Sequence, residues 1–217
     1  MINIEYFEPP EALRHHVSSL YWFETEMPAF ADLMRAELGQ IRLLVDGCGH
    51  TRYRDDRQRS SSGAVLQGPT TAPAHYTAST RLRLFGIGLL PLGWAELITV
   101  PASELADDAV ELDIVMPPAA VARLMDQLAS APDNQSRCRV VCDFLMGRLA
   151  ANRDPAAWFT RLADDWLTAT PNPQVDALVA ASGMSSRSVE RLTQRMYGAP
   201  PKLLARKYRA LTAAVRL

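Results

Sequence analysis

The stretch VDALVAASGMSSRSVERLTQRMYG, residues 175–198, most narrows the folds open to this chain, because it predicts two short helices joined by a sharp turn. Apolar residues recur at helical spacing from about residue 173 to 182. Gly183 follows them, and glycine adopts the positive φ of a sharp turn without a Cβ clash. A serine just after the turn can cap the second helix by accepting a backbone N–H bond. Gly198 is expected to end that helix.

The second helix of this pair, about residues 186–197, is amphipathic. Its apolar residues fall within about 60° of each other on a helical wheel and are expected to face the protein; they are Val189, Leu192 and Met196. The opposite side carries Arg187, Arg191, Gln194 and Arg195. Guanidinium and amide groups contact base edges and phosphates in DNA, and two short helices around a glycine-containing turn have the helix-turn-helix shape. The alternative is an ordinary helical hairpin with a solvated basic face.

The charge of the chain is unevenly distributed. The net charge is −1, but the segment from Pro171 to Leu217 contains eight Lys and Arg against two acidic residues, a net charge of +6. The remainder therefore carries −7. A basic segment on an acidic body favours a polyanionic partner for that segment alone, although a solvated charged face would have the same composition.

Residues 1–116 are dominated by strand signals. VSSLYWFE is an aromatic and β-branched run, QIRLLVDGCGHTRYR has apolar residues before the Asp46-Gly47 turn signal of a hairpin or tight connection, and TRLRLFGIGLLP alternates before it becomes wholly apolar. Short strands separated by Gly and Pro predict a β-barrel or a sandwich. The polar segment DDRQRSSSG (55–63) is expected to be a mobile loop.

Over residues 117–170 the pattern changes to helical spacing. PPAAVARLMDQLAS begins with proline, which suits a helix start, and SRCRVVCDFLMGRLAA and PAAWFTRLADDWLTA predict two further helices. TPNPQ (170–174) contains two prolines in five residues and marks a boundary. We therefore expect an α+β chain with a β-rich domain at 1–116, a helical connector at 117–170 and a basic helical segment at 171–217.

Several classes of protein are disfavoured by motifs that the sequence lacks. It contains no signal peptide and no apolar stretch of membrane-spanning length, so we expect a cytoplasmic protein without membrane contact. No Gly-x-Ser-x-Gly motif occurs, and Cys48, His50 and His75 are too scattered to predict a metal site, so neither catalysis nor a cofactor is expected. Cys138 and Cys142 lie on one face of a predicted helix and are expected to be packing thiols.

Aromatic and polar residues of the β-rich part are candidates for a small-molecule pocket. Such pockets combine apolar walls with a few polar groups. The candidate lining residues are Tyr21, Trp22, Tyr76 and Trp94, together with Arg42 and His75. Ordinary core packing is the alternative for each of them.

The segment SGMSSRSVERLTQRMYGAPPKLLARKYRAL resembles the first helix-turn-helix and the following linker helix of AraC-type transcriptional regulators. The resemblance rests on Gly183, Ser185, Leu192, Gly198, Pro201 and Lys202. The β-rich part is similar to the N-terminal domain of a subset of these regulators, in the stretches LYWFE, LLVDGCGH, LQGPTT, GIGLLPLGWAELI and ELADDAVELD.

One departure from this family pattern affects the expected strength of DNA binding. AraC-type DNA-binding domains carry two helix-turn-helix units, and nothing resembling the second unit occurs up to Leu217. We therefore expect a piece of a longer regulator, or a short form of one. A single unit makes few phosphate contacts, so its DNA binding should be weak and salt-sensitive.

The resemblance implies a DNA-binding transcriptional regulator with a cupin-like barrel at residues 1–116 and sequence-specific major-groove recognition by residues 186–197. Double-stranded DNA, a small-molecule effector and a second copy in a homodimer are the implied partners. The expected DNA contacts are Ser186, Arg187, Ser188, Arg191, Gln194 and Arg195, with Lys202 and Arg206 on phosphates. One alternative is a small-molecule-binding or protein-interaction module that does not bind DNA, and another is a metal-dependent barrel enzyme.

Overall fold

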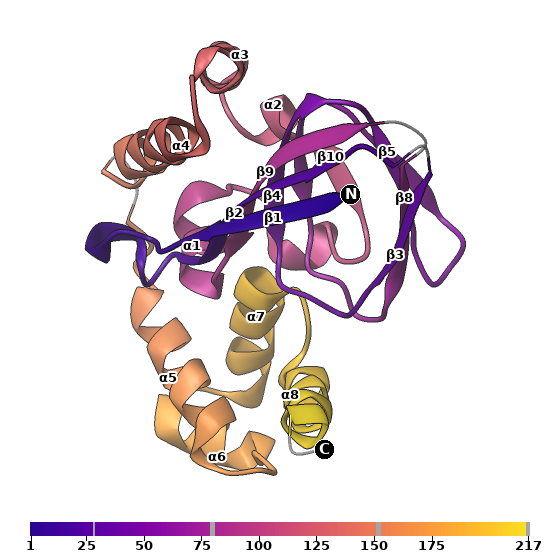
Figure 1. The fold of residues 1–217 in the computed structure, drawn as a ribbon. Helices are drawn as coiled ribbons and strands as arrows, with labels where there is room; N and C mark the ends of the chain where they lie inside the picture. Colours follow the sequence, from indigo (N-terminus) through magenta and orange to yellow (C-terminus); the bar gives the residue numbers. More distant parts are fainter. Residues whose placement is uncertain (28, 79–80, 151–152, 216–217) are drawn as a thin grey trace.

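The structure is a computed structural model that describes residues 1–27, 29–78, 81–150 and 153–215. A β-rich domain comes first in the chain and is followed by helices, the last of which lie below the β-rich domain in Figure 1. The predicted α+β class with a β-rich N-terminal domain is therefore confirmed. Arg216 and Leu217, which belong to the predicted segment 171–217, lie outside the described residues.

Two antiparallel sheets build the β-rich domain. The larger sheet has the strand order β1 (Ile2–Phe7), β2 (Val17–Thr25), β9 (Leu82–Leu89), β4 (Gln40–Asp46), β7 (Ala64–Gln67) and β10 (Ala109–Glu111). The smaller has the order β3 (Phe30–Met34), β8 (Ala74–Ala78), β5 (Gly49–Arg52) and β6 (Gln58–Ser61). The turn at Asp46-Gly47 is a tight connection between the two sheets rather than a hairpin, because β5 pairs with β6 and β8 and not with β4.

The polar segment 55–63 was expected to be a loop, but only part of it is one. Its middle part forms β6, which pairs with β5 from Gly49↔Ser61 to Arg52↔Gln58. The ladder of backbone hydrogen bonds forms here although three of the four β6 residues are exposed, because an edge strand needs little apolar surface.

The two faces of the larger sheet belong to two different apolar clusters. Successive side chains along a strand point to opposite faces of the sheet. One face carries Leu20, Trp22 and Phe85 into the main core, where helices cover it. The other face points Tyr21 and Leu84 toward the smaller sheet, where they form a second apolar cluster.

Helices cover the outer face of the larger sheet. Its core includes residues from α1 (Pro91–Leu97), α2 (Leu112–Val115), α3 (Pro118–Ser130) and α4 (Asn134–Leu149), and from the short 3-10 turns η1 (Glu11–Leu13) and η2 (Ala102–Glu104). In α4 the Sγ atoms of Cys138 and Cys142 lie 3.9 Å apart and both residues are buried, which confirms them as packing thiols.

The C-terminal helices form a second core of their own. It joins residues of α5 (Ala157–Ala169), α6 (Val175–Ser182), α7 (Ser186–Tyr197) and α8 (Pro201–Val215). The predicted turn chemistry is confirmed: Ser185 accepts the N–H of Ser188 at 3.2 Å, and Gly183 and Gly198 adopt φ values of 64° and 75° at the ends of α6 and α7. Local sequence thus fixes the shape of this helical unit. Among the described residues no helix is long and apolar enough to cross a membrane.

The helical unit packs directly against the β-rich domain. α7 contacts η2 and α1, and α8 contacts the β-rich domain through Lys207, whose ammonium donates to the carbonyl oxygen of Thr70 at 2.7 Å. Figure 1 shows α7 running from the helical unit up to the β-rich domain. The outer face of α7 and the space between the two sheets therefore remain as candidate functional surfaces.

Candidate nucleic-acid interface and ligand cavity

Helix α7 has a buried face and a solvent face, as its sequence predicts. Val189 and Met196 are buried and Leu192 is half-buried. Arg187 and Arg191 are exposed. They line a shallow hollow on the outside of the helix together with Ser188, Glu190 and Gln194. The two guanidiniums thus project from a helix whose other side is anchored in the core of the helical unit.

Two serines near the start of α7 were also expected to contact DNA. Ser186 is exposed in the first turn, and Ser188 is half-buried. The hydroxyl of Ser188 lies 3.0 Å from that of Ser185 and is therefore already engaged in the helix cap. Ser186 is the freer of the two hydroxyls.

Arg195 differs from the expectation of a freely exposed side chain. Its two terminal nitrogens donate to the two carboxylate oxygens of Asp154 at 2.7 and 2.8 Å. Burial opposes ionisation of Asp154, but the hydrogen bonds from Arg195 and from the N–H of Ala156 hold the pKa of that carboxyl below its usual value. A bidentate pair of this kind fixes geometry, so Arg195 ties α7 to the segment that precedes α5.

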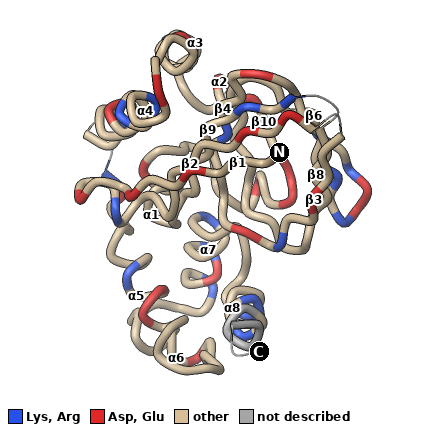
Figure 2. The backbone as a smooth tube through the Cα atoms, in the orientation of Figure 1, with Lys and Arg blue, Asp and Glu red and all other residues tan. Residues whose placement is uncertain are grey.

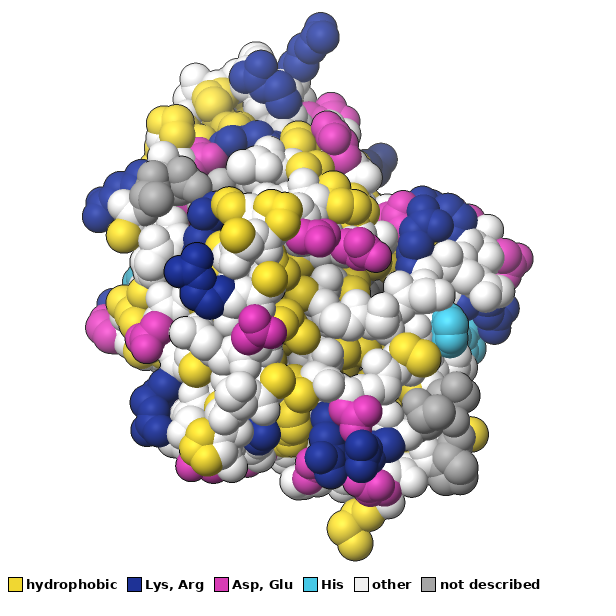
Figure 3. Space-filling view, turned by 90° about the horizontal axis from the view of Figure 1, so that it is seen from above, with side chains coloured by type: hydrophobic (Ala, Val, Ile, Leu, Met, Phe, Trp, Pro, Cys, Tyr) yellow, Lys and Arg dark blue, Asp and Glu magenta, His cyan; other side chains and the backbone are white. Residues whose placement is uncertain are grey.

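Helix α8 adds exposed basic groups beside α7. Lys202 and Arg206, the predicted phosphate contacts, are both exposed. Arg209 donates to the side-chain oxygen of Asn172 at 2.9 Å, and Lys207 points toward the β-rich domain instead. Basic residues mark α8 in Figure 2, whereas charges of both signs are interspersed on the face of the molecule seen from above in Figure 3.

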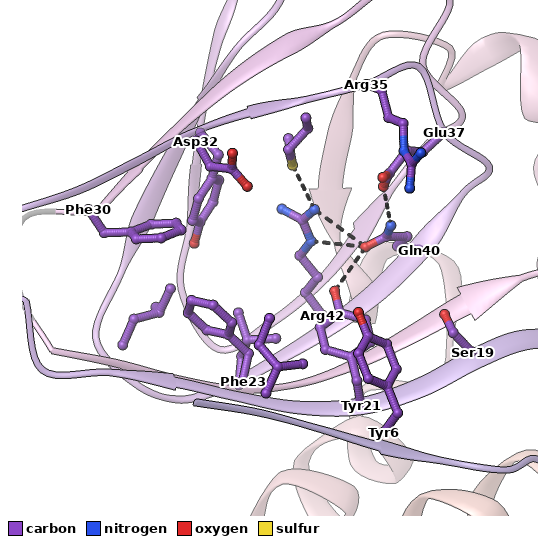
Figure 4. A pocket seen from close by; sticks show the side chains of 15 residues that line it. Tyr6, Ser19, Tyr21, Phe23, Phe30, Asp32, Arg35, Glu37, Gln40 and Arg42 are labelled. Atoms are coloured by element: carbon purple, nitrogen blue, oxygen red, sulfur yellow. Dashed lines mark hydrogen bonds between the residues drawn. The ribbon is translucent and has the colours of Figure 1, made fainter. Parts of the chain in front are cut away.

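A cavity of about 400 Å³ opens between the two sheets of the β-rich domain. Figure 4 shows side chains from both sheets converging on it. Its aromatic and charged lining comprises Tyr6, Tyr21, Phe23, Phe30 and Tyr76, with Asp32, Arg35, Glu37 and Arg42. Cavities of this size with aromatic walls and a few polar groups are typical of small-molecule sites.

Three of the six predicted pocket residues line this cavity and three do not. Tyr21, Arg42 and Tyr76 are among the lining residues. Trp22 is one residue further along β2, so it points to the opposite face and is buried in the main core. Trp94 is buried in α1, where its indole N–H donates to the carbonyl oxygen of Val100 at 2.9 Å. His75 is exposed and lies at a separate hollow near Tyr53. Trp22, Trp94 and His75 therefore do not line this cavity, in contrast to the expectation that all six residues share one pocket.

Gly86 of β9 makes room for the polar part of the cavity, and its role was missed from the sequence. It lies opposite Tyr21 on β2 and opposite Arg42 on β4. A Cβ at Gly86 would lie 2.1 Å from the Cζ atom of Tyr21. The alternating glycines of the LFGIGL stretch could have shown this, because glycine inside a strand marks a close approach.

Three donors converge on one acceptor inside the cavity. The side-chain oxygen of Gln40 accepts from Nε and Nη2 of Arg42, both at 3.3 Å, and from the hydroxyl of Tyr21 at 3.2 Å. Burial raises the pKa of Tyr21, which keeps its hydroxyl a donor at neutral pH. An amide oxygen has only two lone pairs, so these donors exceed what Gln40 alone can satisfy.

A metal site finds no support in the described part of the chain. No group of three or more His, Cys, Asp or Glu side chains that could hold a metal ion occurs there. His50 lies 3.1 Å from the hydroxyl of Ser60, at the exposed edge of the smaller sheet.

Comparisons with known proteins match parts of this architecture. Residues 5–111 match a family model described as a domain of unknown function (DUF6597), and no curated protein matches the sequence. Similar solved structures include a cupin superfamily protein from Desulfitobacterium hafniense (12% identity, 41% of this chain, 77% of that chain, TM-score 0.32). A cupin-like protein from Thermotoga maritima is also similar (17% identity, 40% of this chain, 67% of that chain, TM-score 0.32). So is ToxT from Vibrio cholerae (7% identity, 90% of this chain, 82% of that chain, TM-score 0.49). The family match spans the β-rich domain and ends with β10.

Proposed function

We propose that this chain is a DNA-binding transcriptional regulator of AraC type, or a piece of one, in which α7 enters the major groove of double-stranded DNA. The observation that carries the proposal is the pair Arg187 and Arg191, exposed on a helix whose opposite face is anchored by Val189 and Met196. A recognition helix needs a rigid support on one side and free donors on the other.

The proposed contacts follow from exposure. Arg187, Arg191 and Gln194 would read base edges, since guanidinium and amide groups make bidentate bonds to purines. Ser186 would contact the DNA backbone, and exposed Lys202 and Arg206 of α8 would contact phosphates. Arg195 and Ser188 would act indirectly, by holding α7 in place.

The same proposal includes the remaining parts of the regulator. A small molecule held by the β-rich domain would act as effector, two copies would form a homodimer, and the protein would work in the cytoplasm without a catalytic step. The cavity between the sheets supports the effector site, because it combines aromatic walls with polar and charged groups that can orient a ligand.

Fluorescence anisotropy with mixed-sequence duplex DNA tests the proposal. Binding should weaken steeply between about 50 and about 200 mM salt, because counterions are released from the phosphates. Arg191→Ala should lower the affinity about 10-fold, as expected for a lost base or phosphate contact, and leave the melting temperature unchanged. Arg123→Ala, at an exposed position of α3, is the matched control. Equal affinities of the two variants, or a melting temperature lowered by Arg191→Ala, would contradict a DNA-contact role.

A second candidate function is a small-molecule-binding or protein-interaction module that does not bind DNA. The specific observation in its favour is the buried Arg42 in the cavity. A ligand could bind there whether or not the protein binds DNA. Ligand binding without any salt-dependent DNA binding would favour this second function over the first.

A further inference from the structure

The cavity between the sheets contains a buried guanidinium whose partners are all neutral. Arg42 is only 6% exposed. Its hydrogen bonds go to the side-chain oxygen of Gln40 and to the sulfur of Met34, and its guanidinium carbon lies 5.2 Å from the centre of the Tyr76 ring. Within the described residues Arg42 takes part in no ion pair.

This arrangement leaves the guanidinium of Arg42 without a directly bonded counterion. Buried charges in proteins are normally paired, because removing an ion from water is costly unless a counterion compensates for the lost hydration. The carboxylate of Glu37 is the acid linked to Arg42, but the amide of Gln40 stands between them: its nitrogen donates to Glu37 at 2.5 Å and its oxygen accepts from Arg42. Figure 4 shows this order of side chains.

The donors around Arg42 share a single acceptor oxygen. Nε and Nη2 of Arg42 and the hydroxyl of Tyr21 all point at the single oxygen of Gln40, at distances of 3.2 to 3.3 Å. These are longer than the usual value of about 2.9 Å. A carboxylate has two charged oxygens and matches the fork of a guanidinium in two parallel bonds.

The rest of the cavity is suited to a ring-sized apolar body. Phe23, Phe30 and Tyr76 line it and form edge or tilted contacts with one another. Asp32 and Glu37 also line it, and these acids would repel any negative charge of a ligand that Arg42 does not hold directly.

We propose that this cavity binds a small carboxylate with one negative charge and a ring-sized apolar body. The carboxylate replaces the oxygen of Gln40 on Arg42 and accepts the hydroxyl of Tyr21, and the ring packs among Phe23, Phe30 and Tyr76. This proposal rests on the proposed function and gives the chemical class of its effector. The test of the proposal uses no DNA, so failure of ligand binding can be distinguished from failure of DNA binding.

Isothermal titration calorimetry of the unmodified chain tests the charge requirement. Benzoate and cinnamate serve as anionic probes, benzamide and cinnamamide as neutral probes of nearly the same shape, and benzylamine as a cationic one. The carboxylates should bind about 10- to 100-fold more tightly than their amides, the range for a hydrogen bond to a charged group. Equal affinity for the amides, tighter binding of benzylamine, or no carboxylate binding at millimolar concentration overturns the proposal.

Two variants then locate the site. Arg42→Met removes the charge at nearly constant length and should abolish the preference for carboxylate over amide. Arg123→Met, at an exposed position of α3 outside the cavity, should keep that preference within a factor of about two, since a solvent-exposed charge contributes little. An unchanged preference in Arg42→Met overturns the proposal. Should Arg42→Met fail to fold, the comparison of carboxylate and amide on the unmodified chain still decides.

Discussion

Lys207 and Thr70 connect the last described helix to the β-rich domain, through the bond from the Lys207 ammonium to the Thr70 carbonyl oxygen. Lys207 is half-buried, and this burial lowers the pKa of its ammonium. Thr70 in turn bonds twice to Glu37: its N–H donates to the Glu37 carbonyl oxygen at 3.0 Å, and its hydroxyl accepts the Glu37 N–H at 2.8 Å. The Glu37 carboxylate also accepts from the amide nitrogen of Gln40, and the amide oxygen of Gln40 accepts from Arg42. A continuous series of hydrogen-bonded residues therefore connects the cavity to α8.

The first prediction concerns this connection. A carboxylate that displaces Gln40 from Arg42 should alter the Glu37 contacts and thereby the docking of α8. We expect cinnamate to change amide hydrogen exchange in residues 35–40 and in residues 201–209, measured by mass spectrometry, and to leave α3 unchanged. Two sites are coupled when events at both of them shift the same conformational equilibrium; here that equilibrium is the docking of α8.

Lys207→Met isolates the last step of that connection. In this variant cinnamate should still alter exchange in residues 35–40, with its affinity unchanged within about twofold, because the cavity lining is intact. The response in residues 201–209 should disappear. A full response of α8 in Lys207→Met would show that the connection runs elsewhere.

The second prediction concerns the pair Arg195 and Asp154. Asp154→Asn should lower the free energy of unfolding by about 1 kcal/mol at pH 7, a modest value because the Arg195 side chain is 37% exposed and water screens the pair. Urea unfolding measures this loss. Asp126→Asn, at an exposed position of α3, should have almost no effect.

The pH dependence of that loss follows from the sign of the pKa shift. The pKa of Asp154 is lower in the folded than in the unfolded protein, so the folded state binds fewer protons at this carboxyl. The stabilisation is therefore complete above the ordinary carboxyl pKa and is lost as the pH falls through the lowered, folded value. The difference between wild type and Asp154→Asn should shrink over that acidic range. A difference that stays constant with pH would mean that the variant acts through packing and not through charge.

The helical unit could be predicted because its signals are local. Gly183, Ser185 and Gly198 act on the backbone within a turn of their own positions, and the apolar spacing of α7 shows which face is buried. The contact of Arg195 with Asp154 joins residues 41 positions apart. No local pattern marks such a pair, so Arg195 was expected on the free face of the helix.

The cavity was harder to predict because its lining depends on which face of the sheet the helices cover. Tyr21 and Trp22 are neighbours of similar character, yet one lines the cavity and the other lies in the main core. Alternation shows that they point to opposite faces, but not which face is inside. The position of Gly86 opposite both Tyr21 and Arg42 settles this, and it becomes visible only when the strand register is known.

The third prediction compares Gly198 with Gly183, which end α7 and α6 in the same left-handed conformation. An alanine at either position should cost about 1 kcal/mol from backbone strain alone. A Cβ at Gly183 meets nothing within 4 Å, whereas a Cβ at Gly198 would lie 2.3 Å from Cγ of Pro69 in the β-rich domain. Gly198→Ala should therefore be the more destabilising by a further 1 to 3 kcal/mol (roughly) in urea unfolding, because overpacking adds to the strain. Equal losses in the two variants would mean that α7 does not press against the β-rich domain in solution.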